Sequence, residues 1–152
     1  MEATSYLPFL EHVLTPRRLD HSLGVMRVME DLTQVYSLDR ERALVAGLLH
    51  DAAKDFQPEK LVGLAKKAGI EIYHPCEWDP LYLHGPVSAY LVHIELNVTD
   101  STILDVISMH TYYGSGTDFS KPMLWCLRFA DLLEPTREGQ GLERLREIVY
   151  AG

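Results

Sequence analysis

The sequence predicts an all-α fold, and three observations support this prediction. Apolar residues recur at spacings of three and four along most of the chain, which is the period of amphipathic helices. Alternating apolar and polar residues, the pattern of strands, are nearly absent. Prolines and capping residues stand where successive helical patterns begin. We therefore expect one domain, residues 1–152, built as a bundle of about six to eight helices.

Composition and charge exclude several classes of function. The 152 residues carry a formal net charge of −8, which argues against binding to the backbone of a nucleic acid, because that binding needs clustered Lys and Arg. No apolar run approaches the roughly 20 residues of a membrane span, and the start of the chain lacks the pattern of a signal peptide. The two cysteines, Cys76 and Cys126, are far apart and indicate reduced thiols in a cytoplasmic protein.

The first half of the chain is expected to form four helices. Residues 5–14 have a short amphipathic pattern. Thr15 and Pro16 then combine a capping residue with a proline at the first helical position, and the pattern they open continues to about residue 36. Asp39 can cap a helix at 40–54 that is apolar on nearly every side, so we expect it to be the central buried helix. A fourth helix at 58–68 begins at a proline and ends before a glycine.

The second half alternates loops with helices. Two prolines and the lack of a clear period predict an ordered loop at 70–85, with an extended piece at 70–73. Pro86 is expected to begin a helix, and Thr99 or Asp100 to cap the next. The remaining expected segments are a Gly/Ser-rich loop at 111–121 and helices at 86–97, 100–110, 122–133 and 142–150.

Several polar side chains fall on the apolar stripes of these helices. His21 shares a stripe with Val25 and Val28, and Asp131 shares one with Leu124 and Leu127. Burying an unpaired carboxylate costs several kcal/mol, so Asp131 is expected to have a metal, an arginine or a helix N-terminus beside it. Six candidate residues come from five separate segments; four of them are on the inward face of a predicted helix, and His84 ends the predicted loop. The six are His21, His50, Asp51, His84, His110 and Asp131.

Four imidazoles and two carboxylates form the mixed nitrogen and oxygen ligand set that suits Fe, Mn, Co or Zn. Six ligands are too many for one tetrahedral site, and they fit a buried two-metal centre with one bridging carboxylate. The alternative is that these histidines are hydrogen-bonded core residues of a helical domain. That alternative predicts a purified protein without metal.

The order His, His-Asp, His, His, Asp resembles the HD-domain metal-dependent phosphohydrolases, an all-helical superfamily. The resemblance is closest to the YqeK-type symmetrical diadenosine tetraphosphate hydrolases. It rests on the runs Ala46-Gly-Leu-Leu-His50-Asp51-Ala-Ala-Lys54 and Ala130-Asp131-Leu-Leu-Glu134-Pro135-Thr-Arg137, and it spans residues 18–137. The loop at 111–121 is longer than the loop of the family, and the chain ends at Gly152, earlier than many members.

The resemblance implies a role for each matching residue. One metal would be held by His21, His50, Asp51 and Asp131, and the second by His84, His110 and the shared Asp51, with iron as the expected metal. Besides Asp51, the expected catalytic residues are Arg18, Lys54 and Arg137, which would face the substrate phosphates. The further expected substrate-binding residues are Gly85 and Thr111.

The implied activity is hydrolysis of diadenosine tetraphosphate to two ADP by a metal-bridging hydroxide. Two alternatives stay open: an HD phosphohydrolase acting on another nucleotide or phosphate ester, and a non-catalytic metal- or nucleotide-binding HD module. The expected partner is a small nucleotide, with no nucleic acid and no membrane, and a homodimer is one possible assembly.

Overall fold

The computed structural model describes residues 2–72, 79–111 and 121–152, with side chains omitted at 79–81. Across these residues the chain forms one short 3-10 helix and eight α-helices, and no strand is present in them, which confirms the all-α class. In order they are η1 (Ala3–Tyr6), α1 (Leu7–Val13), α2 (Pro16–Tyr36), α3 (Arg40–Leu49), α4 (Pro58–Lys67), α5 (Asp79–Leu96), α6 (Ser101–Met109), α7 (Pro122–Leu133) and α8 (Leu142–Ala151).

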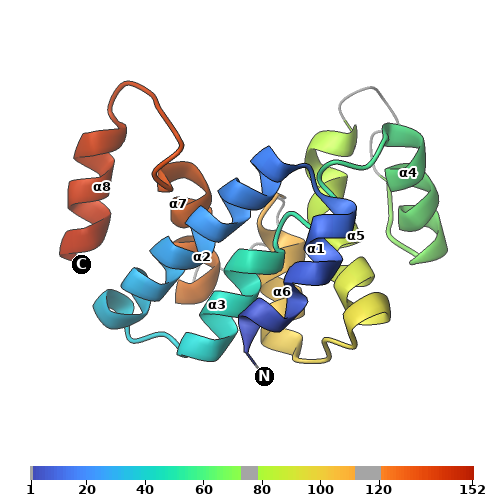
Figure 1. Cartoon of the computed structure of the whole chain (residues 1–152), viewed down its shortest axis with the longest axis horizontal. Coiled ribbons are helices and arrows are strands. Elements are labelled where there is room, and N and C mark those ends of the chain that lie inside the picture. Colours follow the sequence, from blue (N-terminus) through green and yellow to red (C-terminus); the bar gives the residue numbers. More distant parts are fainter. Residues whose placement is uncertain (1, 73–78, 112–120) are drawn as a thin grey trace.

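Helix α3 lies at the centre of the bundle, as predicted from its apolar sequence. It packs against α2, α6 and α7, and its residues Leu48 and Leu49 are fully buried. Full burial of one such leucine contributes about 1.5–3 kcal/mol. Helices α4 and α8 lie at opposite ends of the molecule, where α4 packs on α5 and α8 packs on α7 and α2 (Figure 1).

The predicted helix starts are confirmed where a side chain caps the helix. Thr15 Oγ1 accepts from the backbone N–H of Arg18 at 3.2 Å, so α2 begins at Pro16. Asp39 caps α3 by accepting from Arg42 N at 2.9 Å, and Asp100 caps α6.

Helix α3 ends five residues earlier than the predicted 40–54. After Leu49 the backbone continues in turns, with Ala52 N donating to Leu49 O and Lys54 N donating to Asp51 O. The N–H of Ala53 donates instead to Ser88 Oγ on α5, at 2.9 Å. This tertiary bond replaces the helical one, and the turns place His50 and Asp51 at the end of the buried helix.

The predicted start of a helix at Pro86 was wrong, because α5 begins at Asp79 and contains that proline. A proline inside a helix cannot donate to the carbonyl four residues earlier, here that of Tyr82. Thr111 donates its hydroxyl to Tyr82 O at 2.5 Å and supplies the missing bond. Gly85 lets α5 approach this point closely, because a Cβ there would lie 2.4 Å from Thr111 Oγ1.

Other predictions meet the structure only in part. Residues 70–72 form neither helix nor strand, so the expected extended piece is not a strand over these residues. Most of the predicted loop at 111–121 lies outside the described residues, as does Cys76, whereas Cys126 is a buried free thiol.

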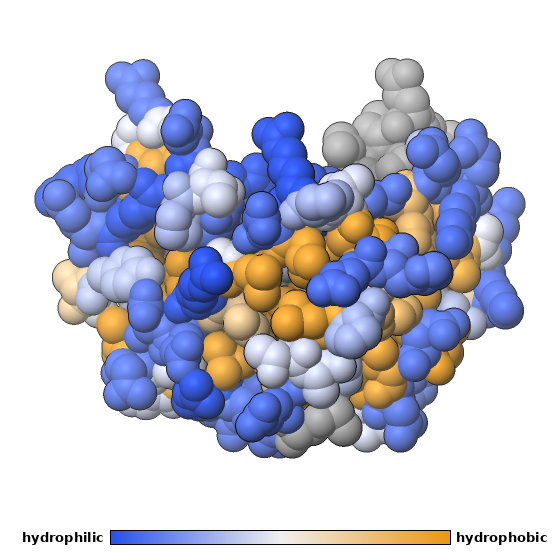
Figure 2. Space-filling model, in the orientation of Figure 1, coloured by the Kyte–Doolittle hydropathy of each residue, from blue (hydrophilic) through white to orange (hydrophobic). Residues whose placement is uncertain are grey.

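On the face in Figure 2, hydrophilic side chains surround apolar ones near the middle. None of the described helices has the length and apolar character needed to cross a bilayer.

Candidate metal centre

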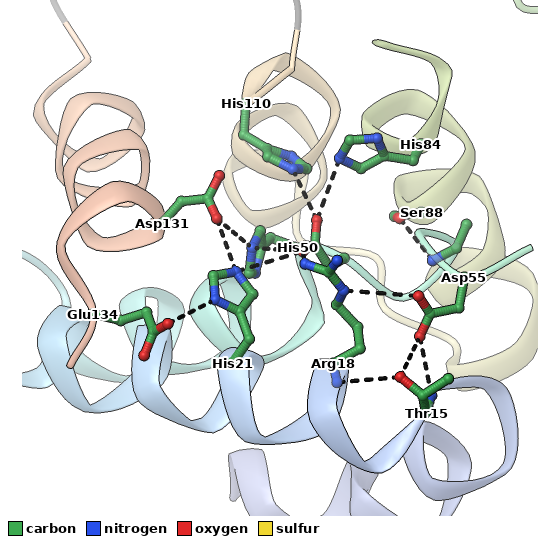
Figure 3. A network of polar contacts seen from close by, with 12 residues as sticks. Thr15, Arg18, His21, His50, Asp55, His84, Ser88, His110, Asp131 and Glu134 are labelled. Carbon is green, nitrogen blue, oxygen red and sulfur yellow. Dashed lines mark hydrogen bonds and ion pairs between the residues drawn. The ribbon is translucent and has the colours of Figure 1, made fainter. Parts of the chain in front are cut away.

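The six candidate ligands converge from five parts of the bundle. His21 comes from α2, His84 from α5 and Asp131 from α7, while His50 and His110 are the C-terminal caps of α3 and α6 (Figure 3). Five of these side chains are buried, and Asp131 is 32% exposed. Two groups have ligand atoms within 4.8 Å of one another, and both contain Asp51: His21, His50, Asp51 and Asp131, and Asp51, His84 and His110.

Asp51 lies between the two groups and turns one carboxylate oxygen toward each. Its Oδ1 is 3.3 Å from Nε2 of His84 and 3.3 Å from Nε2 of His110. Its Oδ2 is 3.3 Å from Nε2 of His50 and 3.6 Å from Nε2 of His21. Asp131 Oδ1 completes the first group at 2.8 Å from His21 Nε2. These are the same two groups that the family resemblance implies.

Hydrogen bonds behind the imidazoles set the tautomer that a metal ligand needs. Nδ1 of His50 donates to Gly47 O at 2.8 Å, and Nδ1 of His110 donates to Ile107 O at 2.6 Å. Since a carbonyl only accepts, the proton of the neutral ring is on Nδ1, and the lone pair is on Nε2, which faces the cluster. The buried Nε2 of His50 has no hydrogen-bond partner in the described part of the chain. This is expected of a nitrogen whose lone pair is available to a metal ion.

The charges in the cluster favour a bound cation. Burial opposes protonation of His50, but the carboxylates of Asp51 and Asp131 outweigh it and raise its pKa to about 10. Burial also opposes ionisation of Asp51, yet its histidine neighbours, led by His50, hold its pKa well below the ordinary value. Without metal, the ionised carboxylates therefore hold a proton on His50, and a bound metal cation would replace that proton and leave the neutral ring as a ligand. The cluster is compatible with binding of a divalent metal.

The residues expected to face substrate lie around this cluster. Arg18 NH1 donates to Asp51 Oδ2 at 3.2 Å, and Arg137 NH2 is 3.6 Å from Asp131 Oδ1. Both arginines line a polar cleft of about 630 Å³ that also reaches His21. Lys54 is half-buried, and its charge acts on His84. Burial of the His84 ring lowers its pKa, and the positive charges of His110 and Lys54 lower it further.

Gly85 and Thr111 contact one another at the α5–α6 junction, as described above. This contact gives both residues a role in packing. Their predicted contact with substrate is not tested by it and stays a prediction.

The sequence interpretation missed the role of Glu134, which is fully buried behind His21. Its Oε1 is 3.1 Å from His21 Nδ1 (Figure 3). Thr136 donates to the Glu134 carboxylate through both its backbone N–H and its hydroxyl. Burial opposes ionisation of Glu134, but these bonds together lower its pKa. The sequence does contain one indication of this contact, which is the glycine one helical turn after His21. A Cβ at Gly24 would lie 2.5 Å from Glu134 Oε2, so only glycine leaves room for the carboxylate.

Comparisons with known proteins agree with this geometry. Residues 18–148 match the HD domain family. The chain is 30% identical to the symmetrical bis(5′-nucleosyl)-tetraphosphatase of Bacillus subtilis, over 97% of this chain and 77% of the relative. It is also 30% identical to the protein of the same name from Halalkalibacterium halodurans, over 88% of this chain and 69% of the relative.

A solved structure from Clostridium acetobutylicum has the same fold. It is described as a predicted HD superfamily hydrolase involved in NAD metabolism, and it superposes with a TM-score of 0.83 at 27% identity, covering 99% of this chain and 78% of that one. Together with the sequence relatives, it shows that the chain has the fold of a known family. The chain therefore belongs to the HD domain family and, within it, to the group of symmetrical bis(5′-nucleosyl)-tetraphosphatases.

Proposed function

We propose that the chain is a metal-dependent hydrolase that cleaves diadenosine tetraphosphate symmetrically into two ADP. The observation that carries the proposal is the pair of ligand groups sharing Asp51 beside an arginine-lined cleft. The names of the relatives from Bacillus subtilis and Halalkalibacterium halodurans support the choice of substrate. In this reaction the oxygen of one water bonds to one of the two central phosphorus atoms. The bond from that phosphorus to the central bridging oxygen breaks, a proton is released, and each half leaves as ADP.

The ligand set proposed here would hold two metal ions, one at His21, His50, Asp51 and Asp131 and the other at Asp51, His84 and His110. Such metals would supply a water of lowered pKa and polarise phosphoryl oxygens. Iron is our choice of metal from the family resemblance, and Mn, Co and Zn suit the same nitrogen and oxygen ligands.

The cations of the chain have a separate task, which is to bind and orient the phosphates. Arg18 and Arg137 line the polar cleft together with Arg17, and Lys54 is close enough to His84 for its charge to act on that ring. The protein has a net charge of −8, so a polyphosphate needs this local positive charge to bind. Charge that develops on the phosphoryl oxygens is stabilised by the same guanidinium groups.

The first experiment combines metal analysis with identification of the product. Purified protein is expected to contain two metal ions per chain and to convert the dinucleotide to ADP alone. Asp51→Ala should abolish activity and lower the content of both metals, because Asp51 belongs to both groups. Asp131→Asn is the matched variant, because it belongs to one group and should leave about one metal bound. Unchanged helical content in circular dichroism is the control for folding.

Two results would contradict the proposal. Full activity of metal-free Asp51→Ala protein would exclude the two-metal site. Products other than ADP from the wild-type protein would exclude symmetrical cleavage.

A second candidate function is hydrolysis of another nucleotide, because the solved neighbour is described as involved in NAD metabolism. Assays with mononucleotides and other dinucleotides alongside diadenosine tetraphosphate separate the two functions.

The single domain at 1–152 is supported by the family match over 18–148. The cytoplasmic location and the homodimer stay predictions.

A further inference from the structure

A second cleft borders the candidate metal centre on its α7 side. It has a volume of about 520 Å³ and lies between α7 and the segment that leads into α8. Its apolar wall is built from Trp125, Phe129, Leu132 and Leu142. Leu132 is 47% exposed, which is unusual for a large apolar side chain in this molecule.

The aromatic wall is held in a fixed arrangement. The rings of Trp125 and Phe129 have centroids 6.5 Å apart, one turn from each other on α7. The Arg128 guanidinium lies 4.9 Å from the centre of the Trp125 ring, and its NH2 group donates to Met109 O at 2.8 Å. Because Arg128 ties the indole to the end of α6, the wall is preorganised to receive a flat ligand.

The aromatic cleft adjoins the polar cleft. Arg137 and Glu138 line both clefts, and Asp131 lines the aromatic one while its Oδ1 faces His21 and His50. A ligand whose phosphates lie at Arg137 therefore has the aromatic cleft on one side. It has the arginine-lined polar cleft on the other.

We propose that the aromatic cleft binds one adenine base of the dinucleotide, while the phosphates extend past Arg137 toward the histidine cluster. This inference rests on the proposed function and adds the position of one nucleoside. Aromatic side chains bind bases by stacking, at about 1–3 kcal/mol per base. The two halves of a symmetrical substrate then occupy unlike surfaces, one aromatic and one rich in arginine.

The experiment measures binding of ADP and of pyrophosphate to metal-loaded protein by calorimetry. Both ligands have two phosphates, but only ADP has a base. Trp125→Ala and Phe129→Ala should weaken ADP binding by about tenfold or more while leaving pyrophosphate binding within about twofold. Trp125→Phe keeps a ring and should restore most of the ADP affinity. Leu132→Ala changes an exposed wall residue without disturbing the core, and it should weaken ADP binding to a smaller degree.

Ile148→Ala is the matched control, because Ile148 is an apolar residue of α8 that is 54% exposed and does not line the cleft. It should bind both ligands as the wild-type protein does. Equal losses for ADP and pyrophosphate in Trp125→Ala and Leu132→Ala, or no loss for either, would overturn the inference. Failure of the proposed function is seen separately, as absence of ADP production by the wild-type protein.

Discussion

At the scale of single residues, the candidate centre depends on the groups behind the ligands as much as on the ligands. Asp51 faces the four histidines with its two oxygens, and its position follows from the turns that end α3. His21 depends on Glu134, which comes from a part of the chain 113 residues away. A carboxylate that accepts from the far nitrogen of a ligating histidine fixes the ring and makes it a stronger ligand.

Glu134→Gln is therefore expected to weaken metal binding without removing a ligand. The amide oxygen of glutamine still accepts from His21, but it lacks the negative charge, and the amide nitrogen cannot accept from Thr136. Loss of such an outer partner typically lowers metal affinity about 10–100-fold. Competition with a chelator of known affinity measures the change. Thr136→Val keeps the carboxylate and should have a smaller effect, and wild-type affinity in Glu134→Gln would show that His21 needs no charged partner.

The inward direction of His21 and Asp131 could be predicted from the sequence because helical phase is a local property. Each lies on the apolar stripe of its helix, in α2 and α7. Glu134 continues the spacing of Leu127 and Asp131, but it is the C-terminal cap of α7, where the backbone leaves the helical conformation, so the helical period no longer fixes the direction of its side chain. Its burial depends on Gly24 of a different helix, which is a contact that a local pattern does not encode.

At the scale of elements, the junction of α5 and α6 explains the largest error in the predicted fold. Proline is common at the start of a helix, so Pro86 was interpreted as the first residue of one. Inside α5 it leaves the carbonyl of Tyr82 without its helical donor, and Thr111 supplies a hydroxyl from beyond α6. The helix is thus completed by a tertiary bond. By contrast, the starts of α2, α3 and α6 were predictable because their caps are local.

A double-mutant cycle at this junction tests the compensation. Thr111→Val removes the hydroxyl that donates to Tyr82 O and is expected to cost about 0.5–1.5 kcal/mol of unfolding free energy, the usual contribution of one hydrogen bond. In a Pro86→Ala background residue 86 has an N–H that can make the helical bond, so the same change should cost less. Urea unfolding of the four proteins measures the coupling. An equal cost of Thr111→Val in both backgrounds would show that the hydroxyl does not substitute for the proline's missing donor.

At the scale of the whole molecule, charge is divided between the surface and the site. The net charge of −8 argues against binding to nucleic acid backbones, but it does not indicate where cations gather. The structure brings Arg17, Arg18 and Arg137 to one cleft from α2 and from the segment after α7. Their proximity results from the packing of α2 against α7, which sequence spacing does not reveal.

The same packing predicts that the stability of the molecule depends on bound metal. The candidate ligands come from five parts of the bundle, so a metal bound in the native state joins helices that unfolding separates. Metal at one hundred times its dissociation constant should add about 2.7 kcal/mol of stability. In a protein of this length that corresponds to a rise in Tm of about 5–11 °C. Scanning calorimetry of chelator-treated protein, before and after metal is restored, measures the rise.

Asp51→Asn is the control for this experiment, because it keeps the shape of the side chain and removes the charge shared by both groups. Its Tm should change little when metal is added. A ligand stabilises a protein only when it binds the folded state more tightly than the unfolded state. An unchanged Tm of the wild-type protein on addition of metal would therefore mean that the folded cluster does not bind metal more tightly than the unfolded chain does. The six side chains would then be a hydrogen-bonded polar core, in which His50 is the cation between Asp51 and Asp131.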